Sequence, residues 1–137
     1  MQLKEIMSRP ARCVSPEDTL VDAAQIMLTE DIGVLAVARD SAVLGIITDR
    51  DITIRAVAAR MDPACTRVSE VMTAGALTCP EDGNVEDARR LMEERRVRRL
   101  VVTDARGSPA GMVSLGDLAL LLPQGQSGEI LKEVSRP

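Results

Sequence analysis

Apolar and polar positions follow one another in the same order twice along this chain. After Thr19, apolar residues return at spacings of three and four, which predicts an amphipathic helix over residues 19–30 with Thr19 as its N-cap. Two short apolar runs follow at residues 34–38 and 43–48, and the polar turn between them predicts a β-hairpin. A further helix is expected over residues 49–60.

The same order of elements returns roughly 65 residues later, which is the pattern of an internal repeat. Two stretches show it in the letters themselves: VSPED at 14–18 becomes TCPED at 78–82, and GIITDRD at 45–51 becomes GMVSLGD at 111–117. In this second copy, Asn84 and Asp87 are expected to open the first helix, and the last helix is expected over residues 115–122. The hairpin between these helices has a longer turn that contains Gly107.

The predicted fold class is α+β, with two repeats that each run strand-helix-strand-strand-helix. A unit half the size of this chain buries too little surface to be stable alone, so the two sheets are expected to pack sheet to sheet with pseudo-twofold symmetry and clefts between the copies. The expected boundaries are residues 1–62 for the first repeat, 63–70 for a linker and 71–123 for the second repeat. Residues 124–137 are expected to be a polar, mobile tail.

Composition removes several function classes. The 137 residues include no Trp, Tyr, Phe or His, so aromatic base stacking, histidine acid-base catalysis and histidine metal ligation are excluded. A net charge of −4 disfavours a general nucleic-acid or anionic-membrane binder. The chain shows no nucleophile paired with a base, no glycine-rich phosphate loop and no metal-ligand cluster, so we expect neither a catalytic nor a metal site, and no enzyme.

The sequence also indicates the cellular location of the protein and the redox state of its cysteines. No apolar segment has the length of a secretory signal or a membrane span, which favours a cytoplasmic protein. Cys13, Cys65 and Cys79 are odd in number and far apart, so they are expected to be free thiols. A redox role for Cys13 with Cys79 is a minor alternative.

The sharpest local feature is a hydroxyl residue that ends a strand, followed three positions later by a carboxylate in the first turn of a helix. Thr48 with Asp51 forms one such pair, and Ser114 with Asp117 forms the other. A helix N-terminus suits phosphate, and a carboxylate accepts hydrogen bonds from the two hydroxyls of a ribose, so the pair suits a nucleotide. The same spacing is also that of a capping box with no ligand. Spacing alone leaves both interpretations open.

This duplicated pattern, with residues 45–51 and 111–117 as its signature, resembles the CBS (cystathionine beta-synthase) domain family, whose members occur as tandem pairs called Bateman modules. The resemblance covers residues 3–122, and it is greatest to small stand-alone bacterial CBS-pair proteins. It implies a module that binds an adenosine-containing ligand in a cleft between its copies. AMP, ADP, ATP or S-adenosylmethionine is then a regulatory ligand, and no cofactor is obligatory.

The resemblance also implies which residues contact that ligand. Ribose and phosphates are expected at Thr48, Arg50, Asp51, Arg98, Arg99, Ser114 and Asp117, and adenine among the aliphatic Val14, Ile32, Val34 and Ile46. The first copy has Gly33 and Val34 where the second has the two arginines, and Gly116 stands where the first copy has Arg50. The two sites are therefore expected to differ in phosphate affinity. Alternatively, the two arginines only continue a solvated basic run.

The leading functional hypothesis is a ligand sensor that signals to a protein partner, or in a stress response, through rearrangement of a homodimer. The apolar helix over residues 115–122 is a candidate dimer face. The alternative is a structural or interaction scaffold that binds no nucleotide. A nucleic-acid binder using the arginines of residues 89–99 is a weaker third hypothesis.

Overall fold

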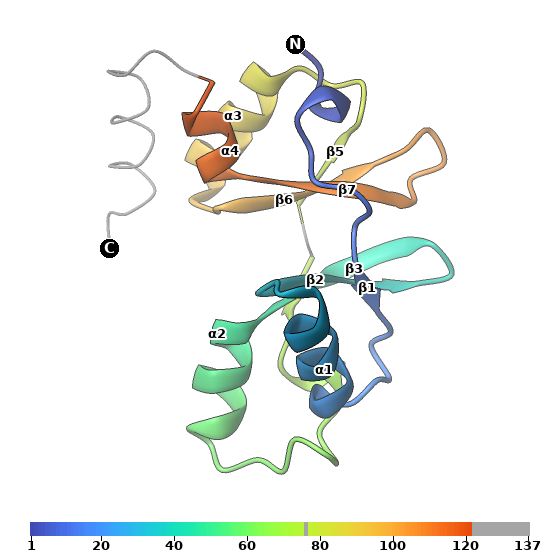
Figure 1. Ribbon diagram of the computed structural model, residues 1–137, viewed down its shortest axis with the longest axis vertical. Helices are drawn as coiled ribbons and strands as arrows, with labels where there is room; N and C mark the ends of the chain where they lie inside the picture. The colour runs from blue at the N-terminus through green and yellow to red at the C-terminus, as the bar shows by residue number, and fades with distance from the viewer. Residues whose placement is uncertain (76, 122–137) are drawn as a thin grey trace. The chain divides into compact units, whose positions relative to one another are not determined.

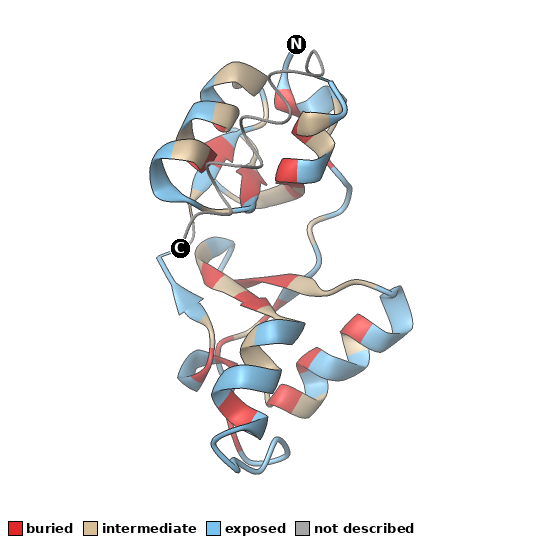
Figure 2. Ribbon diagram, turned by 90° about the vertical axis from the view of Figure 1, so that its left-hand side faces the viewer, coloured by how far each residue is buried: buried red, intermediate tan, exposed pale blue. Residues whose placement is uncertain are grey.

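The computed structural model describes residues 1–75 and 77–121, and these form two compact units (Figure 1). The first-copy unit is Arg12–Ala76, and the second-copy unit combines Met1–Ala11 with the described residues from Leu77 onward. Both units contain buried residues (Figure 2), and the apolar ones among them form a separate cluster in each unit. Among the described helices, none combines the length and the apolar character that a bilayer span requires.

The first-copy unit is built on a four-stranded sheet in the order β1-β2-β3-β4. The strands are β1 (Cys13–Val14), β2 (Val34–Arg39), β3 (Ala42–Thr48) and β4 (Thr73–Ala74). The β1 strand is parallel to β2, whereas β3 is antiparallel to both of its neighbours. The predicted hairpin is confirmed, and its turn is shorter than expected because both strands are longer at the turn end.

Helix α1 (Leu20–Glu30) confirms the first predicted helix. The Thr19 hydroxyl accepts a hydrogen bond from the backbone N–H of Asp22 at 3.2 Å, and the Asp22 carboxylate accepts from the Thr19 N–H at 3.0 Å. This reciprocal pair satisfies two of the donors that a helix start leaves free. The buried side of the helix carries Leu20, Ala23 and Met27, as the apolar spacing predicts.

The helix expected over residues 49–60 lies in the right place but is not a regular α-helix. One α-helical turn, α2 (Asp49–Asp51), leads into a π-helical segment, η2 (Ile52–Val57). The π geometry is visible where Ala58 N–H donates to the carbonyl of Thr53, five residues back, at 3.0 Å. Apolar spacing does not distinguish the two helix types over so short a segment, and π segments often lie near functional sites.

The second-copy unit has a three-stranded sheet in the order β5-β6-β7, with β5 (Thr78–Pro80), β6 (Arg99–Thr103) and β7 (Pro109–Ser114). Its helices are α3 (Val85–Arg95) and α4 (Leu115–Ala119). The β5 strand is parallel to β6, and β6 and β7 form the second predicted hairpin.

Two details of this unit differ from expectation. Asn84 is the N-cap of α3, but its side chain accepts from the N–H of Glu86 at 2.8 Å, and no capping box with Asp87 is formed. Helix α4 ends at Ala119, and Leu120 and Leu121 follow it in a turn. Residue 122 and the tail expected over 124–137 lie outside the described residues.

Each unit is completed by a short segment that lies, in the sequence, just before the other copy. Met1–Ala11 precedes the first copy but joins the second-copy unit, and residues 66–75 precede the second copy but join the first-copy unit. We call these two stretches the leading segments. These two leading segments each contain a short 3-10 helix, η1 (Leu3–Glu5) in the second-copy unit and η3 (Val68–Glu70) in the first-copy unit. Leu3 is fully buried in the cluster of the second-copy unit, and Val68 is fully buried in that of the first-copy unit. The sequence repeat and the packed unit are therefore different sets of residues.

Backbone hydrogen bonds attach each leading segment to the first turn of a helix in its unit. The first N–H of α1, at Leu20, donates to the carbonyl of Thr66 at 3.0 Å. The first N–H of α3, at Val85, donates to the carbonyl of Met1 at 3.1 Å. The first N–H groups of a helix have no partner within that helix, so each leading segment supplies one from outside.

Candidate functional site

The signature pair of the first copy lies at the junction of β3 and α2. Thr48 ends the strand and caps the helix: its hydroxyl accepts from the N–H of Asp51 at 3.0 Å, and its own N–H donates to Asp51 Oδ2 at 3.0 Å. Both side chains are partly buried. We call these residues the first-copy junction.

The second copy repeats this geometry between β7 and α4. Ser114 N–H donates to Asp117 Oδ2 at 2.9 Å, and Asp117 N–H donates to the Ser114 hydroxyl at 3.1 Å. We call this pair the second-copy junction. The capping box is thus formed in both copies. Each cap uses one oxygen of its carboxylate, Oδ2, so capping does not exclude a ligand at the other oxygen.

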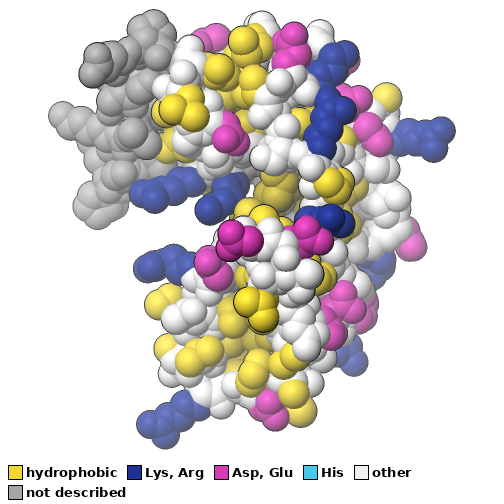
Figure 3. Space-filling view, in the orientation of Figure 1, with side chains coloured by type: hydrophobic (Ala, Val, Ile, Leu, Met, Phe, Trp, Pro, Cys, Tyr) yellow, Lys and Arg dark blue, Asp and Glu magenta, His cyan; other side chains and the backbone are white. Residues whose placement is uncertain are grey.

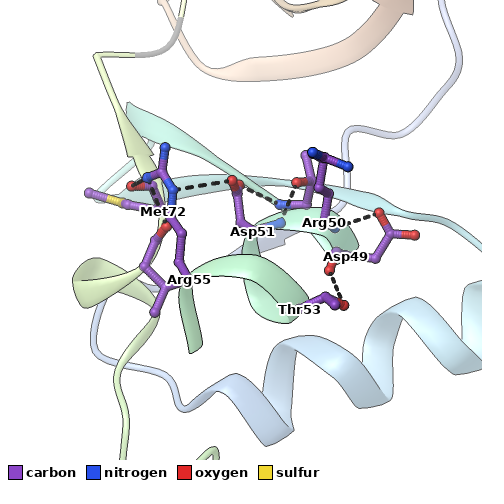
Figure 4. A network of polar contacts seen from close by, with 8 residues as sticks. Asp49, Arg50, Asp51, Thr53, Arg55 and Met72 are labelled. Carbon is purple, nitrogen blue, oxygen red and sulfur yellow. Dashed lines mark hydrogen bonds and ion pairs between the residues drawn. The ribbon is translucent and has the colours of Figure 1, made fainter. Parts of the chain in front are cut away.

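Arg55 extends the first-copy junction, and sequence reasoning did not single it out (Figure 4). Its Nε lies 3.8 Å from Asp51 Oδ1, and its Nη1 donates to the backbone carbonyls of Val71 and Met72, each at 3.3 Å. The available signal was its position four residues after Asp51, because side chains at that spacing meet on a helix. Leu121 has the corresponding position in the second copy.

Asp49 gives the first-copy junction a second carboxylate. Its N–H donates to the carbonyl of Gly33 at 3.0 Å, and its Oδ1 accepts from the N–H of Arg50 at 2.9 Å. A Cβ on Gly33 would lie 2.8 Å from Asp49 Oδ2, so this carboxylate covers the glycine. In the second copy the buried Leu115 stands in its place and donates its N–H to the carbonyl of Arg98 at 2.7 Å.

Arg98 and Arg99 are both exposed at the start of the second-copy hairpin. In the ladder of β6 and β7, Arg99 pairs with Ser114, whereas the corresponding pair in the first copy is Val34 with Thr48. Across antiparallel strands, paired residues have neighbouring Cβ atoms. The structure therefore brings Arg99 beside the signature hydroxyl of the second copy and leaves the first copy with an aliphatic side chain there.

The four aliphatic residues expected around adenine differ in their exposure. Val14 belongs to the buried cluster of the first-copy unit and is only 4% exposed. Ile32 packs against the same cluster, and Val34 and Ile46 are partly exposed. Arg50, which was expected to reach phosphate, is exposed. Of the four aliphatic residues, Ile32, Val34 and Ile46 therefore retain exposed surface that a ligand could contact.

Gly45 and Gly111, the first residues of the two signatures, are needed because a leading segment lies close to each of them. A Cβ on Gly45 would lie 2.4 Å from the carbonyl oxygen of Thr73, and one on Gly111 would lie 2.6 Å from that of Ser8. Neither position has room for a larger residue unless the leading segment moves. The glycine in each copy thus allows the leading segment to pair closely with the strand.

The arginine run of α3 forms a face of mixed charge. Arg89 pairs with both Glu86 and Glu93 at 2.8 Å, and Arg90 lies 3.9 Å from Asp87. Basic and acidic side chains are also interspersed on the face shown in Figure 3. Salt-bridged arginines surrounded by carboxylates are a poor phosphate-backbone track, which disfavours the nucleic-acid hypothesis.

All three cysteines are free thiols, as predicted. Burial raises the pKa of the Cys79 thiol, and the charge of Asp87 raises it further. The hydrogen bond of Cys65 to the Asp62 carboxylate raises the pKa of that thiol. A raised pKa reduces the thiolate fraction, so neither thiol has the character of a reactive cysteine.

Comparison with known proteins identifies the duplicated fold. A model of the CBS domain matches residues 3–57 and again residues 68–123. CBS domain-containing protein YhcV of Bacillus subtilis is 34% identical over 134 residues, which are 97% of this chain and 94% of YhcV. Hypoxic response protein 1 of Mycobacterium tuberculosis is 32% identical over 136 residues, which are 98% of this chain and 94% of that protein. The predicted tandem α+β repeats are confirmed.

Solved structures show the same fold. The crystal structure of hypoxic response protein I, with two coordinated zinc ions, has a TM-score of 0.77 and 33% identity, covering 90% of this chain and all of that one. The CBS domain pair of protein MJ0100, in complex with 5′-methylthioadenosine and S-adenosyl-L-methionine, has a TM-score of 0.77 and 25% identity. That alignment covers 88% of this chain and 94% of the MJ0100 chain.

The described residues show no cluster of side chains that could hold a metal ion. The sequence of this chain has no histidine, and within residues 1–75 and 77–121 no three Cys, Asp or Glu side chains are grouped so as to hold a metal ion. Zinc in proteins is bound by four ligands or by three with a water, mainly Cys and His.

Proposed function

Because this chain belongs to the CBS domain family, with one match in each copy, we propose that it is a regulatory module that binds an adenosine-containing ligand at one or both junctions. The observation that carries the proposal is that, at each junction, one carboxylate oxygen, Oδ1, takes no part in capping. Oδ2 of Asp51 and of Asp117 is used in capping, and Oδ1 remains able to accept hydrogen bonds from ligand hydroxyls. The adenosine ligands of the MJ0100 pair support this choice of ligand class.

The two junctions are proposed to prefer different ligands. Arg99 beside Ser114 provides positive charge for a phosphate in the second copy. In the first copy, the Asp49 carboxylate lies over Gly33 and repels a phosphate at that point. We therefore assign the more phosphorylated ligands, such as ADP or ATP, to the second copy and the uncharged or cationic adenosine ligands, such as S-adenosylmethionine, to the first.

The proposal includes no catalytic step. The ligand acts by favouring one arrangement of the module over another, and the effect passes to a protein partner or through a homodimer in the cytoplasm.

The proposal is tested by titrating the full chain with AMP, ADP, ATP and S-adenosylmethionine in a calorimeter and by following its melting temperature. A ligand that binds only the folded chain raises the melting temperature in proportion to the logarithm of its concentration. The chain has no Trp, Tyr or Phe, so melting is followed by far-ultraviolet circular dichroism. If none of the four compounds raises the melting temperature at millimolar concentration, the proposal is wrong and the scaffold alternative is favoured.

Matched variants separate ligand binding from capping. In Asp51→Asn and Asp117→Asn, the new amide oxygen can still accept the capping hydrogen bond. Both substitutions remove the negative charge that attracts the hydroxyl groups or cations of a ligand. The matched control is Asp22→Asn, because the Thr19–Asp22 capping box has the same chemistry and lies away from the junctions. We expect weaker ligand binding in the two junction variants and unchanged binding in the control. Equal losses in all three would assign the effect to folding.

The scaffold alternative rests on one specific observation. The capping boxes at the junctions have the same geometry as the box at Thr19, which starts an ordinary amphipathic helix. In a pure scaffold, the only cost of removing a junction carboxylate is the loss of a cap, about 1 kcal/mol of stability.

A further inference from the structure

Arg55 links the carboxylate of the first-copy junction to the backbone of the leading segment that completes the same unit. Its guanidinium reaches Asp51 on one side and the carbonyls of Val71 and Met72 on the other (Figure 4). It comes from η2, the π-helical segment that follows α2. One side chain thus contacts two parts of the unit that are distant in sequence.

The distances show that Arg55 leaves Asp51 able to bind something else. The Asp51 side chain is only 14% exposed, and a carboxylate so far from water needs a positive charge nearby. Arg55 supplies that charge, but its Nε is 3.8 Å from Oδ1, which is longer than a hydrogen bond. Oδ1 is therefore attracted by Arg55 while its lone pairs stay available to a ligand hydroxyl.

Within residues 77–121, the second copy shows no counterpart of this arrangement. At the same spacing after Asp117 stands Leu121, whose side chain carries no charge. A carboxylate without such a neighbour is not held toward the leading segment by an ion pair. The contact of Arg55 is thus a property of one junction and not of the repeated signature.

We propose that Arg55 is a positioning residue of the first-copy junction, which holds the Asp51 carboxylate toward its ligand and couples ligand binding to the order of the leading segment at Val71 and Met72. The inference rests on the proposed function, because it concerns the same ligand site. A ligand that binds the arrangement in which Arg55 bridges both parts stabilises that arrangement, and the coupling is reciprocal.

The leading segment is suited to report this coupling because the sheet holds it weakly. Strand β4 has two residues, and its register with β3 consists of Gly45 with Ala74 and Ile46 with Thr73. Segments with so few ladder contacts open locally at low free energy. Val71 is only 1% exposed in the cluster of the first-copy unit, and the two hydrogen bonds from Arg55 add to that burial in fixing Val71 and Met72.

The first experiment measures ligand affinity of the full chain for AMP, ADP, ATP and S-adenosylmethionine in three variants. Arg55→Met keeps the length of the side chain but removes its charge. We expect it to lower affinity about tenfold, which is about 1.4 kcal/mol, for the compound whose binding depends on Asp51, assigned above to S-adenosylmethionine. Arg55→Lys restores a charge near Asp51 and should recover most of this loss. Arg60→Met removes an exposed arginine from the same unit and should leave affinity unchanged.

The second experiment asks whether Arg55 acts through Asp51. In the Asp51→Asn background, Arg55→Met should cause little further loss of affinity, because the group it positions is already altered. Additive losses in this double-mutant cycle would mean that Arg55 touches the ligand directly or acts elsewhere, and would overturn the positioning role.

Hydrogen exchange tests the coupling. Saturating ligand should slow amide exchange over residues 71–75 in the unmodified chain and in Arg60→Met, but not in Arg55→Met. If the unmodified chain binds none of the four compounds, the proposed function fails and this inference fails with it. If the chain binds ligand but no compound depends on Asp51, or Arg55→Met binds the Asp51-dependent compound equally well or shows the same protection of residues 71–75, the proposed function stands and only the inference is overturned.

Discussion

Replacing Gly45 by alanine should push the leading segment of the first-copy unit away from strand β3. The new Cβ would lie 2.4 Å from the Thr73 carbonyl oxygen and 3.3 Å from the Ala74 Cα, and both are backbone atoms that no side-chain rotation can move. A Cβ essentially never comes within 3.0 Å of a heavy atom beyond its own residue and its chain neighbours, so the segment must retreat by at least about 0.6 Å. That retreat strains the hydrogen bond from Gly75 N–H to the Leu44 carbonyl, now 2.9 Å long.

The expected loss of stability follows from three contributions. Inserting one extra carbon into a closely packed site costs about 1–3 kcal/mol, and a weakened backbone hydrogen bond adds about 1 kcal/mol. Alanine offsets about 0.4–1 kcal/mol of this loss of stability, because it restricts the unfolded chain more than glycine does. The net expectation is a loss of about 2 kcal/mol in the free energy of unfolding.

Urea denaturation followed by far-ultraviolet circular dichroism measures this loss, and a second glycine provides the matched control. A Cβ on Gly116 would find its nearest neighbour at 3.6 Å, an ordinary contact, within helix α4. Gly116→Ala should therefore stabilise the chain by up to about 1 kcal/mol, the difference in helix propensity. If Gly45→Ala proves as stable as the unmodified chain, the packing of Thr73 against β3 is not as described and the reasoning fails.

Three further predictions concern other parts of the chain. Thr48→Ala should lower the free energy of unfolding by about 1 kcal/mol through loss of the cap, and Thr48→Ser should restore most of it. Deleting residues 1–8 should destabilise the second-copy unit far more than the first, because Leu3 is fully buried there; hydrogen exchange that rises equally in both units would contradict this. Cys79, whose pKa is raised by burial, stays protonated to a higher pH, so it should alkylate more slowly in the folded chain than in urea at the same pH, as mass spectrometry can show.

Helices and hairpins were predictable because their information is local. Thr19 with Asp22, and the apolar stripe that follows, fix α1 within a dozen residues of sequence. In the hairpin of β2 and β3, Asp40 and Ser41 both have positive φ, which is the geometry of a tight two-residue turn. Residues of this kind carry the signal for their own conformation.

The leading segments could not be recognised in the same way. A three-residue 3-10 helix such as η3 and a two-residue strand such as β4 are too short to show any apolar period. Their partners, such as the first turn of α1, lie more than a helix and a hairpin away along the chain. Placing Val68 and Leu3 in their cores requires the three-dimensional contacts themselves.

The candidate sites were predictable in composition but not in environment. Spacing placed each hydroxyl and carboxylate correctly, because a capping box is itself a local motif. Arg55 was missed since the π-helical geometry of η2 and the nearby Val71 carbonyl cannot be read from the letters. The different surroundings of Asp51 and Asp117 therefore appear only in the folded chain.

The exchange of leading segments has a consequence for how this chain reaches its native state during synthesis. Residues 1–11 leave the ribosome well before residues 77–118, against which Leu3 and Met7 are packed. Until that later stretch has emerged, these apolar side chains have no native surface to cover them, which makes the nascent amino-terminal segment a natural contact for chaperones. The buried cluster of the Arg12–Ala76 unit, by contrast, draws all of its members from one continuous stretch, which is complete before the second copy is made.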